Sequence, residues 1–189
     1  MNADVTAPRK PAHLFSRRLF AQVLAVIAVV WCVDLPAEAT PPTGVTFTVL
    51  NRATVPEFDA RRRFLQESDD PSRPRRMPWK IEMEATRTID VVTVLFTVQP
   101  GGDSGWHTHP GPAIFTISAG SLTMYDADDP ACTPHLFPAG TGSIEADTSA
   151  HSHLLRNETG SVAETVVTFL VPVGALIRTD LPDPGNCSF

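Results

Sequence analysis

Four of the six histidines form two His-x-His pairs, His107 with His109 and His151 with His153. Alternate residues of a β-strand point to the same face, so each pair can present two imidazole rings to a common interior. Neutral imidazole is a good ligand for iron, nickel, copper and zinc. One such pair arises easily by chance, but two pairs in one small β-rich chain predict a metal site.

The chain around these pairs has the pattern of an all-β protein. It has many short segments rich in β-branched and aromatic residues, separated by glycine and proline, and no long amphipathic helical run. Such segments predict a β-sandwich or a β-barrel, with an immunoglobulin-like sandwich as the alternative to a barrel. The strand candidates are Val45–Leu50, Trp79–Ala85, Asp90–Val98, Ala113–Ser118, Ser121–Asp126, His153–Asn157 and Glu164–Pro172.

One segment interrupts this pattern. Residues 56–78, PEFDARRRFLQESDDPSRPRRMP, combine mixed charge with several prolines. That composition predicts a flexible, polar insertion exposed to solvent. A short helix over Ala60–Gln66 is the alternative. The strand candidate that follows, Trp79–Ala85, alternates apolar and acidic residues, as a half-exposed strand does.

The first histidine pair lies in a segment that resembles the first motif of the cupin family. That motif reads Gly, five residues, His-x-His, three or four residues, Glu, six residues, Gly. Gly101, His107, His109 and Gly120 fall in register with it. Ala113 stands at the position of the glutamate, and Gly105–Gly120 contains no acidic residue.

The second pair lies in a segment that resembles the second cupin motif, which reads Gly, five residues, Pro-x-Gly, two residues, His, three residues, Asn. Gly142, His153 and Asn157 are in register, whereas Thr148 and Ala150 replace the proline and the second glycine. The resemblance covers about residues 45–177. It implies an all-β, double-stranded β-helix, which is a single-domain jelly-roll barrel.

The resemblance also implies roles for individual residues. His107, His109 and His153 occupy ligand positions for a divalent metal, and Asn157 is a structural residue. His151 is not at a ligand position of the family, but it could act as a fourth ligand or as a partner of the ligands. The alternative is a barrel that binds no metal and whose histidines hydrogen-bond to one another.

The alanine at position 113 leads to an expectation about the substrate. Three neutral imidazoles leave a divalent ion with its full charge, so the site should favour a small anionic, chelating molecule. Three-histidine sites of this type resemble those of iron dioxygenases of the cupin class. The hypothesis is therefore a metal-dependent dioxygenase, and the alternative is a non-catalytic module that binds a metal or a small ligand. No catalytic nucleophile or acid–base residue can be assigned.

The N-terminus has the features of an export signal over residues 1–39. Basic residues precede the apolar run Ala21–Val33, and Ala37 and Ala39 complete a cleavage signature. The stretch SRRLF resembles a twin-arginine signal, which exports folded proteins to the bacterial periplasm or beyond. An uncleaved N-terminal anchor is the alternative. Loading of the metal before export would favour iron among the candidates iron, manganese, nickel and zinc.

Charge and cysteine content narrow the partners of the remaining domain, residues 40–189. It has 11 Lys and Arg against 18 Asp and Glu, a balance that argues against nucleic-acid binding. We expect no stable membrane insertion after cleavage of the signal. Cys132 and Cys187 are its two cysteines, and in an oxidising compartment they predict one disulfide, with two free thiols as the alternative. A homodimer is expected by analogy with cupins.

Overall fold

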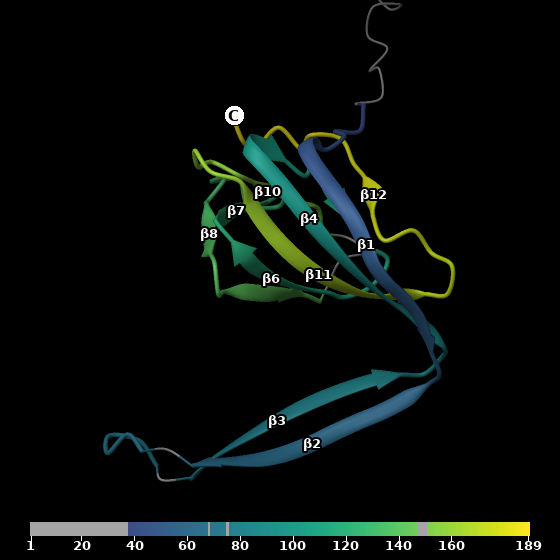
Figure 1. Cartoon of the computed structure of the whole chain (residues 1–189), viewed down its shortest axis with the longest axis vertical. Coiled ribbons are helices and arrows are strands. Elements are labelled where there is room, and N and C mark those ends of the chain that lie inside the picture. The colour runs from purple at the N-terminus through teal and green to yellow at the C-terminus, as the bar shows by residue number, and fades with distance from the viewer. Residues whose placement is uncertain (1–37, 68, 75, 147–150) are drawn as a thin grey trace, which may run out of the picture. The chain divides into compact units, whose positions relative to one another are not determined.

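In the computed structural model, the elements of regular secondary structure assigned to the described residues are all β-strands (Figure 1). The structure describes residues 38–67, 69–74, 76–146 and 151–189, so the predicted export signal lies almost entirely outside the described residues. No helix in these ranges is long and apolar enough to cross a bilayer. The strands are β1 (Thr43–Val55), β2 (Phe58–Glu67), β3 (Arg76–Ala85), β4 (Ile89–Asp103), β5 (His107–Thr108), β6 (Ala113–Ala119), β7 (Ser121–Asp126), β8 (His135–Pro138), β9 (Gly142–Glu145), β10 (His153–Arg156), β11 (Ala163–Pro172) and β12 (Thr179–Asp180).

Ten of these strands form one antiparallel sheet that curls into a nearly closed barrel. The main path runs β12-β5-β10-β4-β11-β6-β9, while β1 pairs with β4, and β7 pairs with both β10 and β8. One side of the barrel therefore contains β1, β4, β11, β6 and β9. The other contains β8, β7, β10, β5 and β12, and the single residue pair Arg156↔Asp103 links β10 to β4. This arrangement is the predicted double-stranded β-helix.

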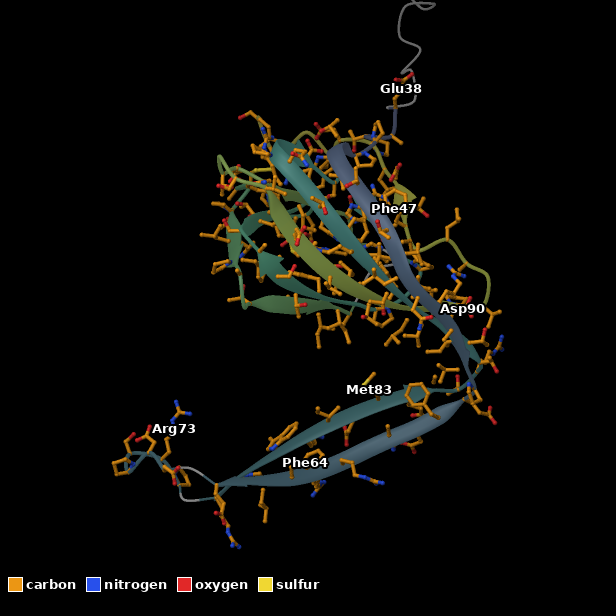
Figure 2. The ribbon with its side chains drawn as sticks, viewed as in Figure 1. Glu38, Phe47, Phe64, Arg73, Met83 and Asp90 are labelled. Carbon is orange, nitrogen blue, oxygen red and sulfur yellow. A yellow bond between two sulfur atoms is a disulfide. The ribbon has the colours of Figure 1, made fainter. Side chains whose placement is uncertain are left out.

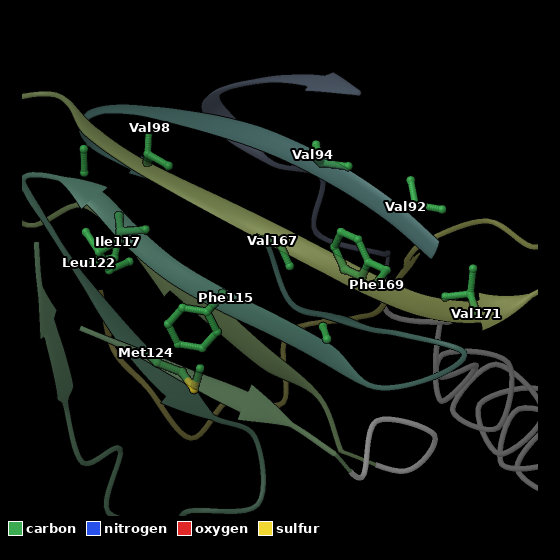
Figure 3. Close-up of a cluster of buried hydrophobic side chains, with 12 residues drawn as sticks. Val92, Val94, Val98, Phe115, Ile117, Leu122, Met124, Val167, Phe169 and Val171 are labelled. Carbon is green, nitrogen blue, oxygen red and sulfur yellow. The ribbon is translucent and has the colours of Figure 1, made fainter. Parts of the chain in front are cut away.

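The core of the barrel comes from the alternating pattern of its strands. On β11, every second residue from Ala163 to Val171 is buried, and β4 shows the same alternation through Val92 and Val94. The inward side chains of β4, β6, β7 and β11 pack into one apolar cluster (Figure 3). Burying each large side chain contributes about 1.5–3 kcal/mol. The strand candidates in this part of the chain are confirmed, because each falls within one of these strands or extends one residue past it.

The insertion is different from our expectation. Residues 58–67 and 76–85 form an antiparallel hairpin, β2 and β3, with register from Phe58↔Ala85 to Glu67↔Arg76. The prediction of a loop, or of a short helix over Ala60–Gln66, was therefore wrong for these strands. The expected exposure to solvent is confirmed for most described residues of the segment. Stacking of Phe64 on Trp79, with ring centroids 4.4 Å apart, supports the pairing. The sequence did not predict the pairing of β2 with β3, because a proline-rich, charged turn separates the two strands.

The expectation that one face of the strand Trp79–Ala85 is buried was also wrong. Ile81 is 47% exposed and Met83 is 38% exposed, although the pattern assigns both to the buried face. Figure 2 shows Phe64 and Met83 on the two strands of the hairpin. A two-stranded sheet has no second layer of its own to cover either face.

The predicted disulfide between Cys132 and Cys187 is present, with the two Cα atoms 5.3 Å apart. It fastens the C-terminal tail to the loop after β7. The Nδ2 group of Asn186 donates hydrogen bonds to the carbonyl oxygens of Asp126 and Asp129, and Phe189 packs on Tyr125. The tail is therefore held at several points beside β7.

Candidate metal centre

The two histidine motifs meet across one antiparallel strand pair. His107 begins β5, His153 begins β10, and the two are Cα partners in the register. Directly opposed residues of an antiparallel pair direct their side chains to the same face. His109 follows β5 and is fixed by a 2.7 Å hydrogen bond between its Nδ1 and the carbonyl oxygen of Ile177.

The three imidazole rings form a compact cluster inside the barrel. Their centroids are 4.5 Å apart for His107 and His153, 4.8 Å for His107 and His109, and 5.2 Å for His109 and His153. One nitrogen from each ring lies within 4.8 Å of one nitrogen of the others. All three residues are buried, at 5% exposure or less. The structure thus brings together the three ligands implied by the cupin resemblance.

Backbone hydrogen bonds determine which nitrogen faces the centre. The Nδ1–H group of His107 donates to the carbonyl oxygen of Gly105 at 2.9 Å, and that of His109 donates to Ile177. A neutral imidazole with a protonated Nδ1 carries its lone pair on Nε2. Each of these rings therefore offers Nε2 as a metal ligand, in the orientation that partners outside the coordination sphere normally impose on such histidines.

The third ring has a nitrogen that a metal would satisfy. The Nε2 atom of His153 is buried without a hydrogen-bond partner among the described residues. A buried polar atom left unpaired costs about 1–3 kcal/mol, so such atoms are rare in folded proteins. A divalent cation at the centre of the three rings would pair with it, so these residues fit a metal.

Burial keeps two of the rings neutral near pH 7. It is the main cause that lowers the pKa of His107 well below its ordinary value, and the positive charges that His153, Arg178 and His109 can carry lower it further. Burial also lowers the pKa of His153 to about 4, against the attraction of the Glu145 carboxylate. Neutral imidazole is the form that binds metal, so these ligands need not lose a proton first.

A carboxylate that sequence analysis missed lies beside the rings. Glu145, the last residue of β9, places Oε2 3.3 Å from Nε2 of His109 and Oε1 3.4 Å from Nε2 of His153. The expectation of a site without an acidic group was therefore wrong. The sequence did not indicate this residue, because Glu145 occupies no ligand position of either cupin motif. Only the pairing of β9 with β6 reveals it.

His151, the candidate fourth ligand, lies outside the cluster of three rings. Its Nε2 is 2.9 Å from Oδ1 of Asp126, and its Nδ1 is 3.4 Å from Oδ1 of Asp128. Burial lowers the pKa of His151, but the hydrogen bonds and charges of the two aspartates outweigh burial and raise it. Both ring nitrogens thus face carboxylates, and His151 serves as an ion-pair partner beside the site.

Asn157 has the structural place that the resemblance implies. It is fully buried, and its Nδ2 group donates to the carbonyl oxygens of Val98 and Ser161. Its Oδ1 accepts hydrogen bonds from the backbone N–H and the hydroxyl of Thr159. Asn157 therefore shapes the turn between β10 and β11 and anchors it to β4.

The three histidines and Glu145 line a small, mainly apolar cavity. Its walls include Phe96, Phe115 and Phe169, and Arg178 is the cationic side chain among its lining residues. The space open to the centres of water molecules is about 50 Å³, enough for a few waters. Glu145 and His153 also line a second pocket, shared with Asp126 and His151.

The sequence matches no protein-family model and no curated protein. Among solved structures, an uncharacterised protein with a double-stranded β-helix domain from Klebsiella pneumoniae matches at 19% identity and a TM-score of 0.40, over 48% of this chain and 73% of that one. A protein of unknown function from Streptococcus pyogenes matches at 17% and 0.36, over 43% of this chain and 65% of that one. Oxalate oxidase in complex with glycolate matches at 21% and 0.37, over 42% of this chain and 41% of that one.

Matches at such low identity and TM-score do not extend to activity or substrate, and this chain spans less than half of the oxalate oxidase chain. The fold is assigned from the strands and motifs of this chain. Both histidine motifs fall on adjacent strands of an antiparallel barrel, and their histidines converge in its interior. This barrel, with its two converging motifs, is the fold of a cupin.

Proposed function

We propose that the protein binds a divalent metal through His107, His109 and His153 and acts on a small anionic organic molecule at that metal. The observation that carries the proposal is the convergence of three buried imidazoles, with one nitrogen from each within 4.8 Å of the others. A bound metal would supply Lewis acidity and, if it were iron, a route to oxygen activation for a dioxygenase reaction.

The anionic character of the substrate is supported by Arg178. This residue lines the cavity beside the histidines, and its Nη2 donates to the carbonyl oxygen of Ser104 at 2.8 Å. Its Nε donates to Asp180, which orients the guanidinium group. Cationic guanidinium groups recognise carboxylates with high directionality. In a cavity with mainly apolar walls, this charge favours a small carboxylate or enolate.

A second candidate function is binding without turnover, as an exported metal or small-ligand module. One observation favours it. The cavity hydroxyls are already engaged, because Ser104 donates to the carbonyl oxygen of Gly105 and Thr165 donates to that of Thr116. Hydroxyl groups held in this way are poorly placed to act as acids or bases. Among the described residues that line the cavity, Glu145 is then the one carboxylate that could transfer a proton, so few groups are available for catalysis.

Our proposed location is the bacterial periplasm or the exterior. The disulfide between Cys132 and Cys187 supports it, since such bonds persist in oxidising compartments. Iron is our preferred metal, because export of the folded protein would allow loading in the cytoplasm, where copper and zinc compete less.

The test is elemental analysis of purified protein beside the variants His107→Ala and His153→Ala. We expect about one divalent ion per wild-type chain and a strong loss in both variants. Absence of bound metal in wild type and variants alike would overturn the proposal. Oxygen uptake with a panel of diketones, thiols and catechols then separates an oxygenase from a binding module, which consumes no oxygen with any of them.

A further inference from the structure

We propose that Glu145 is a fourth metal ligand, supplied from strand β9 in place of the glutamate that Ala113 replaces on strand β6. The inference rests on the proposed metal site and deepens it. It assigns a ligand at a position where neither histidine motif has one. It also explains how the site can contain a carboxylate although residue 113 has no side chain beyond Cβ.

The register of the sheet places Glu145 where the missing carboxylate would be. Ala113 and Glu145 are direct Cα partners across the antiparallel pair β6–β9. Side chains of such partners leave the sheet on the same face, with Cβ atoms about 4.5–5.5 Å apart. Ala113 is fully buried. Because its side chain ends at Cβ, the longer side chain of Glu145 can reach the space in front of it.

The distances agree with two ligands of one ion. Ligands about 2.1 Å from a shared metal, at right or tetrahedral angles, lie about 2.9–3.4 Å from each other. The Glu145 oxygens lie 3.3 Å and 3.4 Å from Nε2 of His109 and His153. Each carboxylate oxygen thus has the spacing from its imidazole that a shared metal ion would impose.

The hydrogen bond of His109 to the backbone agrees with this arrangement. Nδ1 of His109 contacts the carbonyl oxygen of Ile177, so Nε2 is the ring nitrogen that faces Glu145. Nε2 of His109 and the carboxylate oxygen beside it are therefore both placed to bind one cation.

Coordination by Glu145 changes what the site can bind. With one carboxylate and three neutral imidazoles, a divalent ion retains a net single positive charge instead of a double one. An ion with six positions would keep two for a bidentate anion, and Arg178 would add a second positive charge at the cavity wall. The preference for a small anion is thus retained with four protein ligands.

The experiment measures metal affinity and coordination in four proteins: wild type, Glu145→Gln, Ala113→Glu with Glu145→Ala, and Glu164→Gln as a control. Glu164 lies on β11 of the same barrel, outside the lining of the metal cavity. Mn²⁺ and Co²⁺ are the probes, with calorimetry for affinity and cobalt absorption for coordination. Circular dichroism establishes that each variant is folded.

We expect Glu145→Gln to bind both ions at least about 10- to 100-fold more weakly and to alter the cobalt spectrum, while Glu164→Gln does neither. The double variant, which returns the carboxylate to position 113, should recover the wild-type spectrum and much of the affinity. Wild-type affinity and spectrum in Glu145→Gln would overturn the inference and leave the three-histidine site intact. Failure of the wild type to bind either ion would instead overturn the proposed function. A double variant that folds but binds as weakly as Glu145→Gln would also count against the ligand role.

Discussion

His107 and His153 face each other as register partners across β5 and β10, with ring centroids 4.5 Å apart. Each begins its strand, and each comes from a different motif. A strand pair of this kind holds the two rings by backbone hydrogen bonding, so their approach does not depend on side-chain contacts alone. The metal site is therefore built into the barrel, and its properties can be tested through the stability of the barrel.

The stability of the metal-free protein should fall with pH below the ordinary histidine range. The pKa of His153 is about 4 in the folded protein and about 6.5 when unfolded. Because the folded pKa is the lower one, the contribution of His153 to the free energy of unfolding is fully present above pH 6.5. As the pH falls from 6.5 through 4, the free energy of unfolding decreases by about 3 kcal/mol. The lowered pKa of His107 acts in the same direction.

Urea unfolding with a chelator present, at neutral pH and at about pH 4.5, measures this loss. Acidic residues elsewhere also titrate at low pH, so the control is His153→Asn, which removes the imidazole. The variant should lose less stability over this interval than the wild type. Equal losses in both proteins would contradict the assignment of a neutral, buried His153.

Reduction of the disulfide should destabilise the barrel. Cys132 and Cys187 are 55 residues apart in sequence, and closing a loop of this length contributes about 4 kcal/mol in the chain-entropy model. We expect a reductant to lower the free energy of unfolding of the wild type by up to this amount. The variant Cys132→Ser with Cys187→Ser should already be as unstable and should not respond. An unchanged wild-type midpoint under full reduction would count against this role.

Asn157 should matter for folding more than for metal chemistry. Asn157→Ala removes hydrogen bonds to Val98, Ser161 and Thr159 and leaves buried backbone groups unpaired. The free energy of unfolding should fall by about 2–4 kcal/mol. Denaturant titration measures this, and calorimetry at low temperature should find nearly wild-type metal affinity in the folded variant. A variant as stable as the wild type would show that these hydrogen bonds contribute little.

Arg178 should govern the affinity for anions at the metal. Arg178→Ala removes the positive charge from the cavity wall, so small carboxylates should bind the metal-loaded protein about tenfold more weakly. Arg178→Lys should retain part of the affinity, because it keeps the charge and loses the planar donor group. Arg73→Ala is the control, since that side chain is 63% exposed in the turn between β2 and β3. Equal anion affinities in the wild type and Arg178→Ala would contradict the role of Arg178.

The sequence predicted the parts of the molecule whose pattern is local. Strands β4 and β11 alternate buried and outward residues over long runs, and the histidine spacing could be compared with two motifs directly. The hairpin β2–β3 could not be predicted, because its stability depends on pairs such as Phe64 with Trp79 across a long charged turn.

Glu145 was missed for a related reason. Its position in the site follows from a cross-strand register with Ala113, and a register between distant segments is a property of the folded sheet. The position of His151 likewise depends on carboxylates of another strand and its following loop, Asp126 and Asp128. In both cases the residue type was visible in the sequence, while its neighbours were not.

The most direct test of the central claim is anomalous X-ray scattering from crystals of the protein grown with a divalent ion, measured at the absorption edge of that ion. We expect a single strong peak in the barrel, about 2.1 Å from Nε2 of His107, His109 and His153. A barrel with no peak there, or with His153 turned away from the other two rings, would contradict it.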